Sequence, residues 1–111
     1  MKFVVVVVAL LMTEAKAETG IASVYSTRDS MQNGTTTACG PKLKDHALTA
    51  AHKTLPCGAR VRVTYKGKSI VVIITDRGPF IRGRIIDLTL AGAKALGFSG
   101  LAKVTIQRLD F

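Results

Sequence analysis

Hydrophobic and polar residues alternate along several short segments of the chain. Residues 59–65, ARVRVTY, alternate strictly, with valines on one face and arginines on the other. Residues 21–25, IASVY, and 102–109, AKVTIQRL, alternate in the same way. This period of two predicts β-strands that bury one face in a core.

Other segments predict a buried strand and a turn beside it. Residues 69–75, SIVVIIT, are almost continuously apolar and mostly β-branched, which predicts a strand covered on both faces. The preceding KGK at 66–68 predicts a tight turn. Residues 47–51, ALTAA, are compatible with a strand or a short helix, and the polar residues 26–41 predict a loop.

One helix is predicted over residues 89–98, TLAGAKALGF, where apolar side chains recur on one stripe. Asp87 or Thr89 could cap its start, and Gly97 stands where a helix would end. Short strands with one helix predict a compact, mainly β barrel, because closure leaves no strand edge exposed.

The first seventeen residues carry a different pattern. Lys2 precedes the apolar residues 3–12, and AKA at 15–17 fits a small-residue cleavage site. This predicts a secretory signal peptide rather than a membrane span, for which the apolar run is too short. We therefore expect one mature domain over residues 18–111. Because no cysteine directly follows the apolar run, we expect a periplasmic or secreted protein without a lipid anchor.

The chain is strongly basic, with 16 lysines and arginines against 7 acidic residues. Without residues 1–17 the charge is still +8, from 14 basic and 6 acidic residues. Such a charge favours anionic partners. Export argues against nucleic acid and favours an anionic wall polymer or a membrane surface, with a merely solvated surface as the alternative.

The two cysteines, Cys39 and Cys57, predict a disulfide, since an even cysteine count in an exported chain usually forms one. Closing a loop of this size would stabilise the fold by about 3 kcal/mol. A cysteine nucleophile beside His52 and a zinc site are the alternatives. The cysteine and histidine spacings match no common zinc pattern.

Charged residues are densest in TDRGPFIRGRIIDLT, residues 75–89, where Asp76 and Asp87 flank a turn with three arginines. The glycines and the proline turn the chain back, which would let the two carboxylates approach. If they share a groove, repulsion raises one pKa, and that residue can act as an acid. If arginines lie between the two carboxylates instead, both carboxylates stay ionised, and the site binds a ligand rather than cleaves it.

Structural roles compete with these functional ones. Asp76 could accept turn amides, Asp87 could cap the helix, and His52 could be a buried histidine bonded to the main chain. The arginines of the turn are most simply solvated, with a sugar or carboxylate clamp as the alternative: Arg77, Arg82 and Arg84.

Three segments resemble a known family: GIASVYS at 20–26, ALTAAHKTLPCGARVRV at 47–63 and the motif at 75–89. They are similar to the rare lipoprotein A family of bacterial cell-envelope proteins, over nearly the whole mature chain. The resemblance implies a six-stranded double-psi β-barrel with one short helix. It also implies a lytic transglycosylase that acts on peptidoglycan glycan strands. We expect a monomer that uses no metal or cofactor. Expansins share this barrel, so an expansin-like or inhibitor-like barrel that binds polysaccharide or protein without cleaving is the alternative.

The resemblance assigns roles to individual residues. Asp76 matches the aspartate proposed as catalytic in the family, and His52 matches a histidine of the same groove. Asp87 matches the acid of related barrels, and Tyr25 matches an aromatic at the groove edge. We expect Asp76 to be the acid and base, with His52 orienting it or the sugar. The other candidates for substrate contact are Arg77, Arg82 and Asp45.

The chain also departs from the family pattern. Members carry a glutamate and an aspartate in a G-E-x-Y-D pattern before the ALTAAH segment. Here the stretch is GPKLKD, with Pro41 in place of the glutamate and Lys44 in place of the aspartate. Asp45 follows one residue after the position of the family aspartate. The lost acidic pair favours the binding alternative, whereas the intact AAH and DRGP motifs favour an enzyme.

Overall fold

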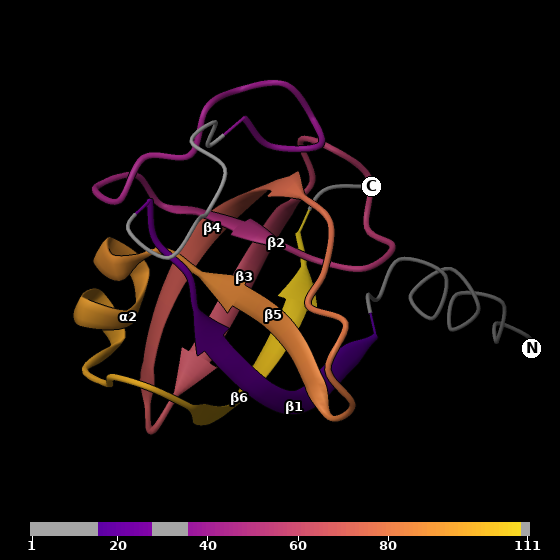
Figure 1. Cartoon of the computed structure of the whole chain (residues 1–111). Coiled ribbons are helices and arrows are strands. Elements are labelled where there is room, and N and C mark those ends of the chain that lie inside the picture. The colour runs from indigo at the N-terminus through magenta and orange to yellow at the C-terminus, as the bar shows by residue number, and fades with distance from the viewer. Residues whose placement is uncertain (1–15, 28–35, 110–111) are drawn as a thin grey trace, which may run out of the picture.

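The computed structural model describes residues 16–27 and 36–109, which form one closed β-barrel with a short helix (Figure 1). The elements are β1 (Ala17–Val24), β2 (Thr49–Ala51), β3 (Arg60–Tyr65), β4 (Lys68–Asp76), β5 (Arg84–Leu88), α2 (Leu90–Leu96) and β6 (Ala102–Arg108). The mainly β prediction is confirmed. The predicted signal peptide falls mostly on residues 1–15, outside the described residues.

The strands follow the order β1-β5-β2-β4-β3-β6 around the barrel, and β6 closes it by pairing with β1. The β1–β5 and β2–β4 pairs are parallel, and the other four pairs are antiparallel. The predicted six-stranded double-psi β-barrel is consistent with this order and is confirmed. The topology places the short strand β2 between the ends of β4 and β5, the two strands that carry the predicted aspartates.

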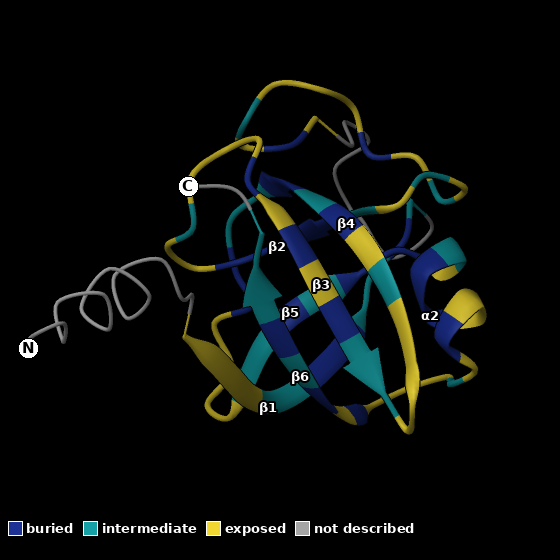
Figure 2. Ribbon diagram, turned by 180° about the vertical axis from the view of Figure 1, so that it is seen from behind, coloured by how far each residue is buried: buried dark blue, intermediate teal, exposed yellow. Residues whose placement is uncertain are grey.

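Buried residues recur along the strands of the barrel (Figure 2), and the core cluster consists mostly of small and branched side chains. Val61 and Val63 of β3 are fully buried, as their alternation predicts, and they belong to the same cluster as Val72 and Ile74 of β4. Leu96 of α2 joins this cluster. Each such buried side chain stabilises the fold by about 1.5–3 kcal/mol, so this cluster is the main source of stability.

The structure corrects one strand prediction, decides an ambiguous one and adds a strand that was not predicted. The prediction that residues 69–75 are covered on both faces is wrong at Val71, which is 39% exposed. The ambiguous segment 47–51 contains β2 rather than a helix. Residues 84–88, which the pattern did not identify as a strand, form β5. Their hydrogen bonds come from parallel pairing with β1, which is distant in sequence, so the local pattern could not predict them.

Local turn and cap signals were more reliable. Lys66 and Gly67 have φ of 45° and 83° and form the predicted tight turn, since two positive φ values match a type I′ hairpin. Thr89 caps α2 by accepting a hydrogen bond from the Gly92 amide, and Gly97 ends the helix at φ 92°. Asp87 is therefore not the cap, because it lies inside β5.

The predicted disulfide is confirmed, with Cys39 and Cys57 joined and their Cα atoms 5.7 Å apart. It links the loop before β2 to the loop after it. Both thiols are consumed, which excludes the cysteine nucleophile and a cysteine–zinc site in this form of the protein. The two loops lie together at one end of the barrel (Figure 1).

Candidate active site

Two aspartates flank the last residue of β2. Ala51 pairs with Asp76 of β4 on one side and with Asp87 of β5 on the other. Neighbouring strands lie about 4.8 Å apart, so the two aspartate Cα atoms are about 10 Å apart, with only a methyl side chain between them. The neighbours of Asp87 in β5, Ile86 and Leu88, are buried in the core, so Asp87 points away from it.

Asp87 is the carboxylate with the perturbed proton affinity. Burial raises the pKa of Asp87, and the negative charge of Asp76 adds to this increase. The hydroxyl of Ser23, which pairs with Asp87 across β1 and β5, donates to Oδ1 and opposes the increase, as does the charge of Arg84. Asp87 therefore keeps its proton to a higher pH than an ordinary aspartic acid does.

Asp76 is held by main-chain groups at the end of β4. Its Oδ1 accepts hydrogen bonds from the Ala38 amide at 2.8 Å and from the Arg77 amide at 2.9 Å. Its carbonyl oxygen accepts from the His52 amide at 3.1 Å. Amides of the flanking loops therefore fix the orientation of this carboxylate, as the turn-amide alternative expects, and this does not preclude a chemical role.

Tyr25 completes the group around the two carboxylates. Its amide donates to the carbonyl of Leu88 at 3.0 Å, which extends the β1–β5 pairing by one residue. Burial raises the pKa of the phenol, the charges of Asp76 and Asp87 raise it further, and the Thr75 side chain beside it opposes them. The phenol therefore stays protonated and neutral. We call Tyr25, Asp76 and Asp87 the carboxylate region.

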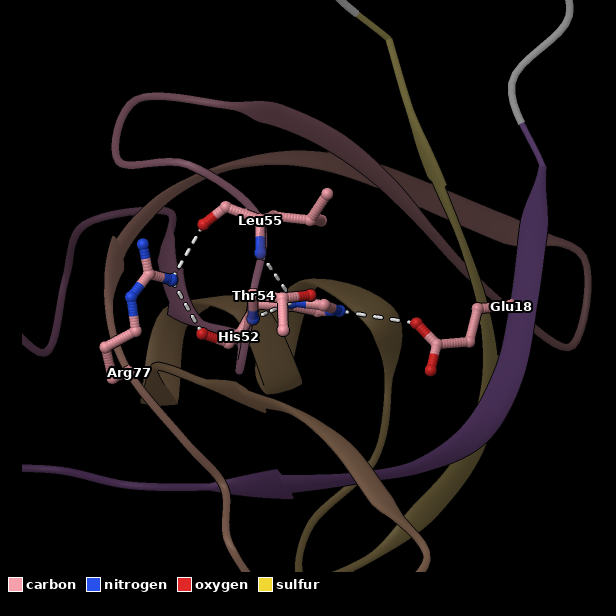
Figure 3. A network of polar contacts seen from close by, with 5 residues as sticks. All are labelled: Glu18, His52, Thr54, Leu55 and Arg77. Atoms are coloured by element: carbon pink, nitrogen blue, oxygen red, sulfur yellow. Dashed lines mark hydrogen bonds and ion pairs between the residues drawn. The ribbon is translucent and has the colours of Figure 1, made fainter.

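His52 lies in a separate network (Figure 3). Its Nδ1 accepts from the amides of Thr54 and Leu55, both at 3.1 Å, which leaves Nε2 to carry the hydrogen. Nε2 lies 3.3 Å from a carboxylate oxygen of Glu18, which reaches over from β1. Because His52 follows Ala51 directly, its side chain leaves the chain on the opposite side. Among the contacts of the described residues, the ring bonds neither aspartate.

Arg77 belongs to the same network as His52. Its Nη1 donates to the carbonyls of His52 and Leu55 at 2.8 and 2.7 Å, and its Nη2 lies 3.8 Å from the Cys57 sulfur. The expectation of a solvated arginine is wrong here, because the guanidinium braces the loop after β2. Among the described contacts, the guanidinium does not bond Asp76. We call Glu18, His52 and Arg77 the histidine region.

The remaining predicted site residues lie elsewhere on the surface. Both carboxylate oxygens of Asp45 accept from Thr27, at 2.9 Å from its amide and 2.9 Å from its hydroxyl. Asp45 thus anchors the chain after β1, and its role in substrate contact stays a prediction. Arg82 is exposed in the turn before β5 and also stays a candidate.

Two residues of these networks were missed from the sequence. Ser23 stands two positions before Tyr25 in an alternating segment, so the strand period could have placed both on one face. Glu18 gives no such signal, because its contact with His52 joins residues that are 34 positions apart.

The described residues contain no group of three or more potential metal ligands. Within the same part of the chain, no helix is long and apolar enough to cross a bilayer.

Residues 17–107 match the family described as lytic transglycolase. The probable endolytic peptidoglycan transglycosylase RlpA of Nostoc is 51% identical over 94 residues, covering 81% of this chain and 25% of that protein. The endolytic peptidoglycan transglycosylase RlpA of Rickettsia felis is 44% identical over 101 residues, covering 87% of this chain and 44% of that protein. The chain thus spans a quarter to less than half of these relatives.

Solved structures share the barrel at low identity. The Streptomyces papain inhibitor superposes with a TM-score of 0.69 at 23% identity, covering 88% of this chain and 98% of the inhibitor. The apo expansin of Clavibacter michiganensis superposes with a TM-score of 0.67 at 19% identity, covering 86% of this chain and 51% of the expansin. At these identities the likeness establishes the fold and not the activity.

Proposed function

The chain belongs to the lytic transglycolase family, and from this premise we propose that it is an endolytic peptidoglycan lytic transglycosylase. It cleaves the bond between N-acetylmuramic acid and N-acetylglucosamine and leaves 1,6-anhydro-muramyl ends. The names of the relatives from Nostoc and Rickettsia felis support this activity. The observation that carries it is the carboxylate region, in which one aspartate with a raised pKa lies near a second aspartate.

In this mechanism Asp87 is the catalytic acid and then the base. The protonated carboxyl group donates its proton to the glycosidic oxygen as the bond from that oxygen to the muramyl C1 breaks. The muramyl 6-hydroxyl then bonds to C1 and gives its proton to the Asp87 carboxylate, which restores the acid. No water is consumed, so one carboxyl group completes the cycle, whereas a hydrolase needs two.

Asp76 supports this reaction through its charge. Its oriented carboxylate stabilises the positive charge that develops on the sugar, and it helps to keep Asp87 protonated. The family resemblance favoured Asp76 as the acid, but the causes of the Asp87 pKa shift support the reverse division of roles. His52 acts as a positioning residue, since its amide bonds the Asp76 carbonyl while its ring is engaged elsewhere.

We place this activity outside the cytoplasm, where peptidoglycan lies. The disulfide supports this location, because such bonds persist in oxidising compartments. Export by cleavage before Glu18, and release without a lipid anchor, belong to the same proposal. N-terminal sequencing of the exported protein tests the cleavage, because the proposal requires a chain that starts at Glu18.

The deciding experiment is digestion of purified glycan strands, followed by mass spectrometry for anhydro-muramyl ends. The wild-type protein should produce them, and a matched Asp87→Asn variant should not. Wild-type protein that binds the strands without forming anhydro ends would instead support the expansin-like or inhibitor-like alternative, which the replaced acidic pair at Pro41 and Lys44 favours.

A further inference from the structure

A cavity of about 410 Å³ lies beside the carboxylate region. Its lining consists of two lysines, two threonines and two apolar residues: Pro41, Lys42, Lys44, Ala47, Thr49 and Thr75. Thr75 directly precedes Asp76, and its side chain lies beside the phenol of Tyr25. The cavity therefore borders the candidate active site.

The main chain that carries the lysines is tied to the barrel. Lys42 pairs with Thr36 in an isolated β-bridge, and the carbonyl of Lys44 accepts from the Ala47 amide at 3.1 Å. The amide of Cys39 donates to the Thr75 carbonyl at 3.0 Å. The two ammonium groups thus extend from a fixed loop, so little backbone ordering is needed when a ligand binds.

The charge of this cavity is opposite to that of the aspartates beside it. The lining includes two cationic side chains and no carboxylate, and the threonine hydroxyls can donate hydrogen bonds. This combination recognises a carboxylate, because charge-assisted hydrogen bonds from ammonium groups are the stronger ones. A neutral sugar gains much less from two lysines.

We propose that this cavity is an anion subsite that binds a carboxylate carried by the glycan next to the cleaved bond. The inference rests on the proposed function and adds a substrate preference to it. Muramyl residues carry a carboxylate on their lactyl group, and a stem peptide attached there supplies other carboxylates. Lys44 stands where the family resemblance expects an aspartate, so this chain replaces a repulsive charge by an attractive one.

The test compares two double variants that lose the same charge. Lys42→Gln/Lys44→Gln removes the subsite, and Lys94→Gln/Lys103→Gln removes exposed lysines of α2 and β6 as the control. The substrates are peptide-free glycan strands and the same strands with their carboxyl groups reduced to alcohols. On native strands the subsite variant should raise KM about three- to tenfold, with kcat changed less than about twofold. On reduced strands it should match the control.

A third substrate identifies the source of the carboxylate. Strands that retain stem peptides should show the larger dependence on the lysines if the peptide is bound, and peptide-free strands should show it if the lactyl group is bound.

Equal KM values for the two double variants on all three substrates overturn the subsite and leave the proposed function intact. If wild-type protein forms no anhydro ends, the proposed function fails and calorimetric titration with the same strands decides the subsite. Weaker binding of native strands by the subsite variant alone supports it, and equal affinities overturn it.

Discussion

The carboxylate region and the histidine region contain residues that are neighbours in the chain. Asp76 belongs to the first region, and the next residue, Arg77, belongs to the second. Ala51 likewise pairs with Asp76 and Asp87, whereas the next residue, His52, belongs to the histidine region. The cause is the strand period, which sends adjacent side chains to opposite sides. A motif that looks like one catalytic unit in sequence is therefore two structural units.

The two regions also differ in how well their polar groups are satisfied. In the histidine region both ring nitrogens of His52 and the Arg77 guanidinium have partners, most of them main-chain groups. In the carboxylate region burial and like charge raise the pKa of Asp87 and Tyr25. Groups with such perturbed pKa values are typical of catalysis, whereas satisfied networks are typical of support.

The largest effect that tests this contrast is expected for Asp87→Asn. The amide keeps the size of the side chain and can still accept from Ser23, but it cannot transfer a proton. Formation of anhydro-muramyl ends should fall by about 10²–10⁴-fold. Mass spectrometry of digested strands measures this loss, and unchanged circular dichroism controls for folding. An active Asp87→Asn protein would return the acid and base role to Asp76.

The same variant should be more stable than the wild-type protein at neutral pH. Because the folded-state pKa of Asp87 is raised, the ionised form opposes folding, and wild-type stability decreases as the pH rises through this pKa. Asparagine has no such dependence. Denaturant titrations should therefore show a gain at pH 7 and none at pH 3, where Asp87 is protonated in both the folded and the unfolded chain.

Asp76→Asn should also reduce the rate, by about 10²–10³-fold, because it removes an oriented charge rather than the transferred proton. The charge of Asp76 raises the pKa of Asp87, so its removal lowers that pKa. The alkaline limb of the profile of kcat/KM against pH should then move to lower pH. A limb that stays in place, or moves upwards, contradicts the proposed coupling of the two carboxylates.

Sequence patterns predicted the parts of this molecule that depend on neighbours in the chain. The alternation at β3, the cap at Thr89 and the turn at Lys66 all follow from local rules, and the structure has each of them. The strand β5 was not predicted, because its hydrogen bonds come from parallel and antiparallel partners that are distant in sequence. Closure of the barrel depends on all six strands together, and it was the family resemblance that predicted the six-stranded barrel.

The candidate site could be predicted only in part for a related reason. The motifs identified Asp76, Asp87 and Tyr25, and the structure brings these three together. They did not indicate that His52 turns away towards Glu18, since strand direction at the end of β2 decides this. Nor could they indicate which aspartate has the raised pKa, because burial is a tertiary property.

The disulfide lies between the two regions and should stabilise both. The Cys39 amide donates to the Thr75 carbonyl next to Asp76, and the Cys57 sulfur lies beside Arg77. Cys39→Ser/Cys57→Ser should reduce the free energy of unfolding by about 3 kcal/mol. Denaturant titration measures this loss. A reducing agent should destabilise the wild-type protein equally and leave the variant unchanged, and free thiols in native protein would contradict the prediction.

The smallest effects are expected in the histidine region. His52→Ala leaves the amides of Thr54 and Leu55 without their acceptor, which should reduce the free energy of unfolding by about 1–3 kcal/mol. Thermal unfolding measures this loss. Below the melting temperature, kcat should fall by less than about tenfold, because a positioning residue transfers no proton. A loss as large as that of Asp87→Asn, with the stability unchanged, would place the His52 ring in the chemistry.

Glu18→Gln is the matched control for that variant. It keeps an acceptor for the Nε2 hydrogen of His52 and removes only a charge on a side chain that is 51% exposed. Because the His52 ring is neutral in this arrangement, the contact is a hydrogen bond, which contributes about 0.5–1.5 kcal/mol and which glutamine can still accept. The melting temperature should therefore fall by only a few degrees, less than for His52→Ala. Since none of the described polar contacts of Glu18 reaches the carboxylate region, the profile of kcat/KM against pH should be unchanged. A shifted profile in Glu18→Gln would mean that the two regions are one coupled site, and the division drawn between them would be wrong.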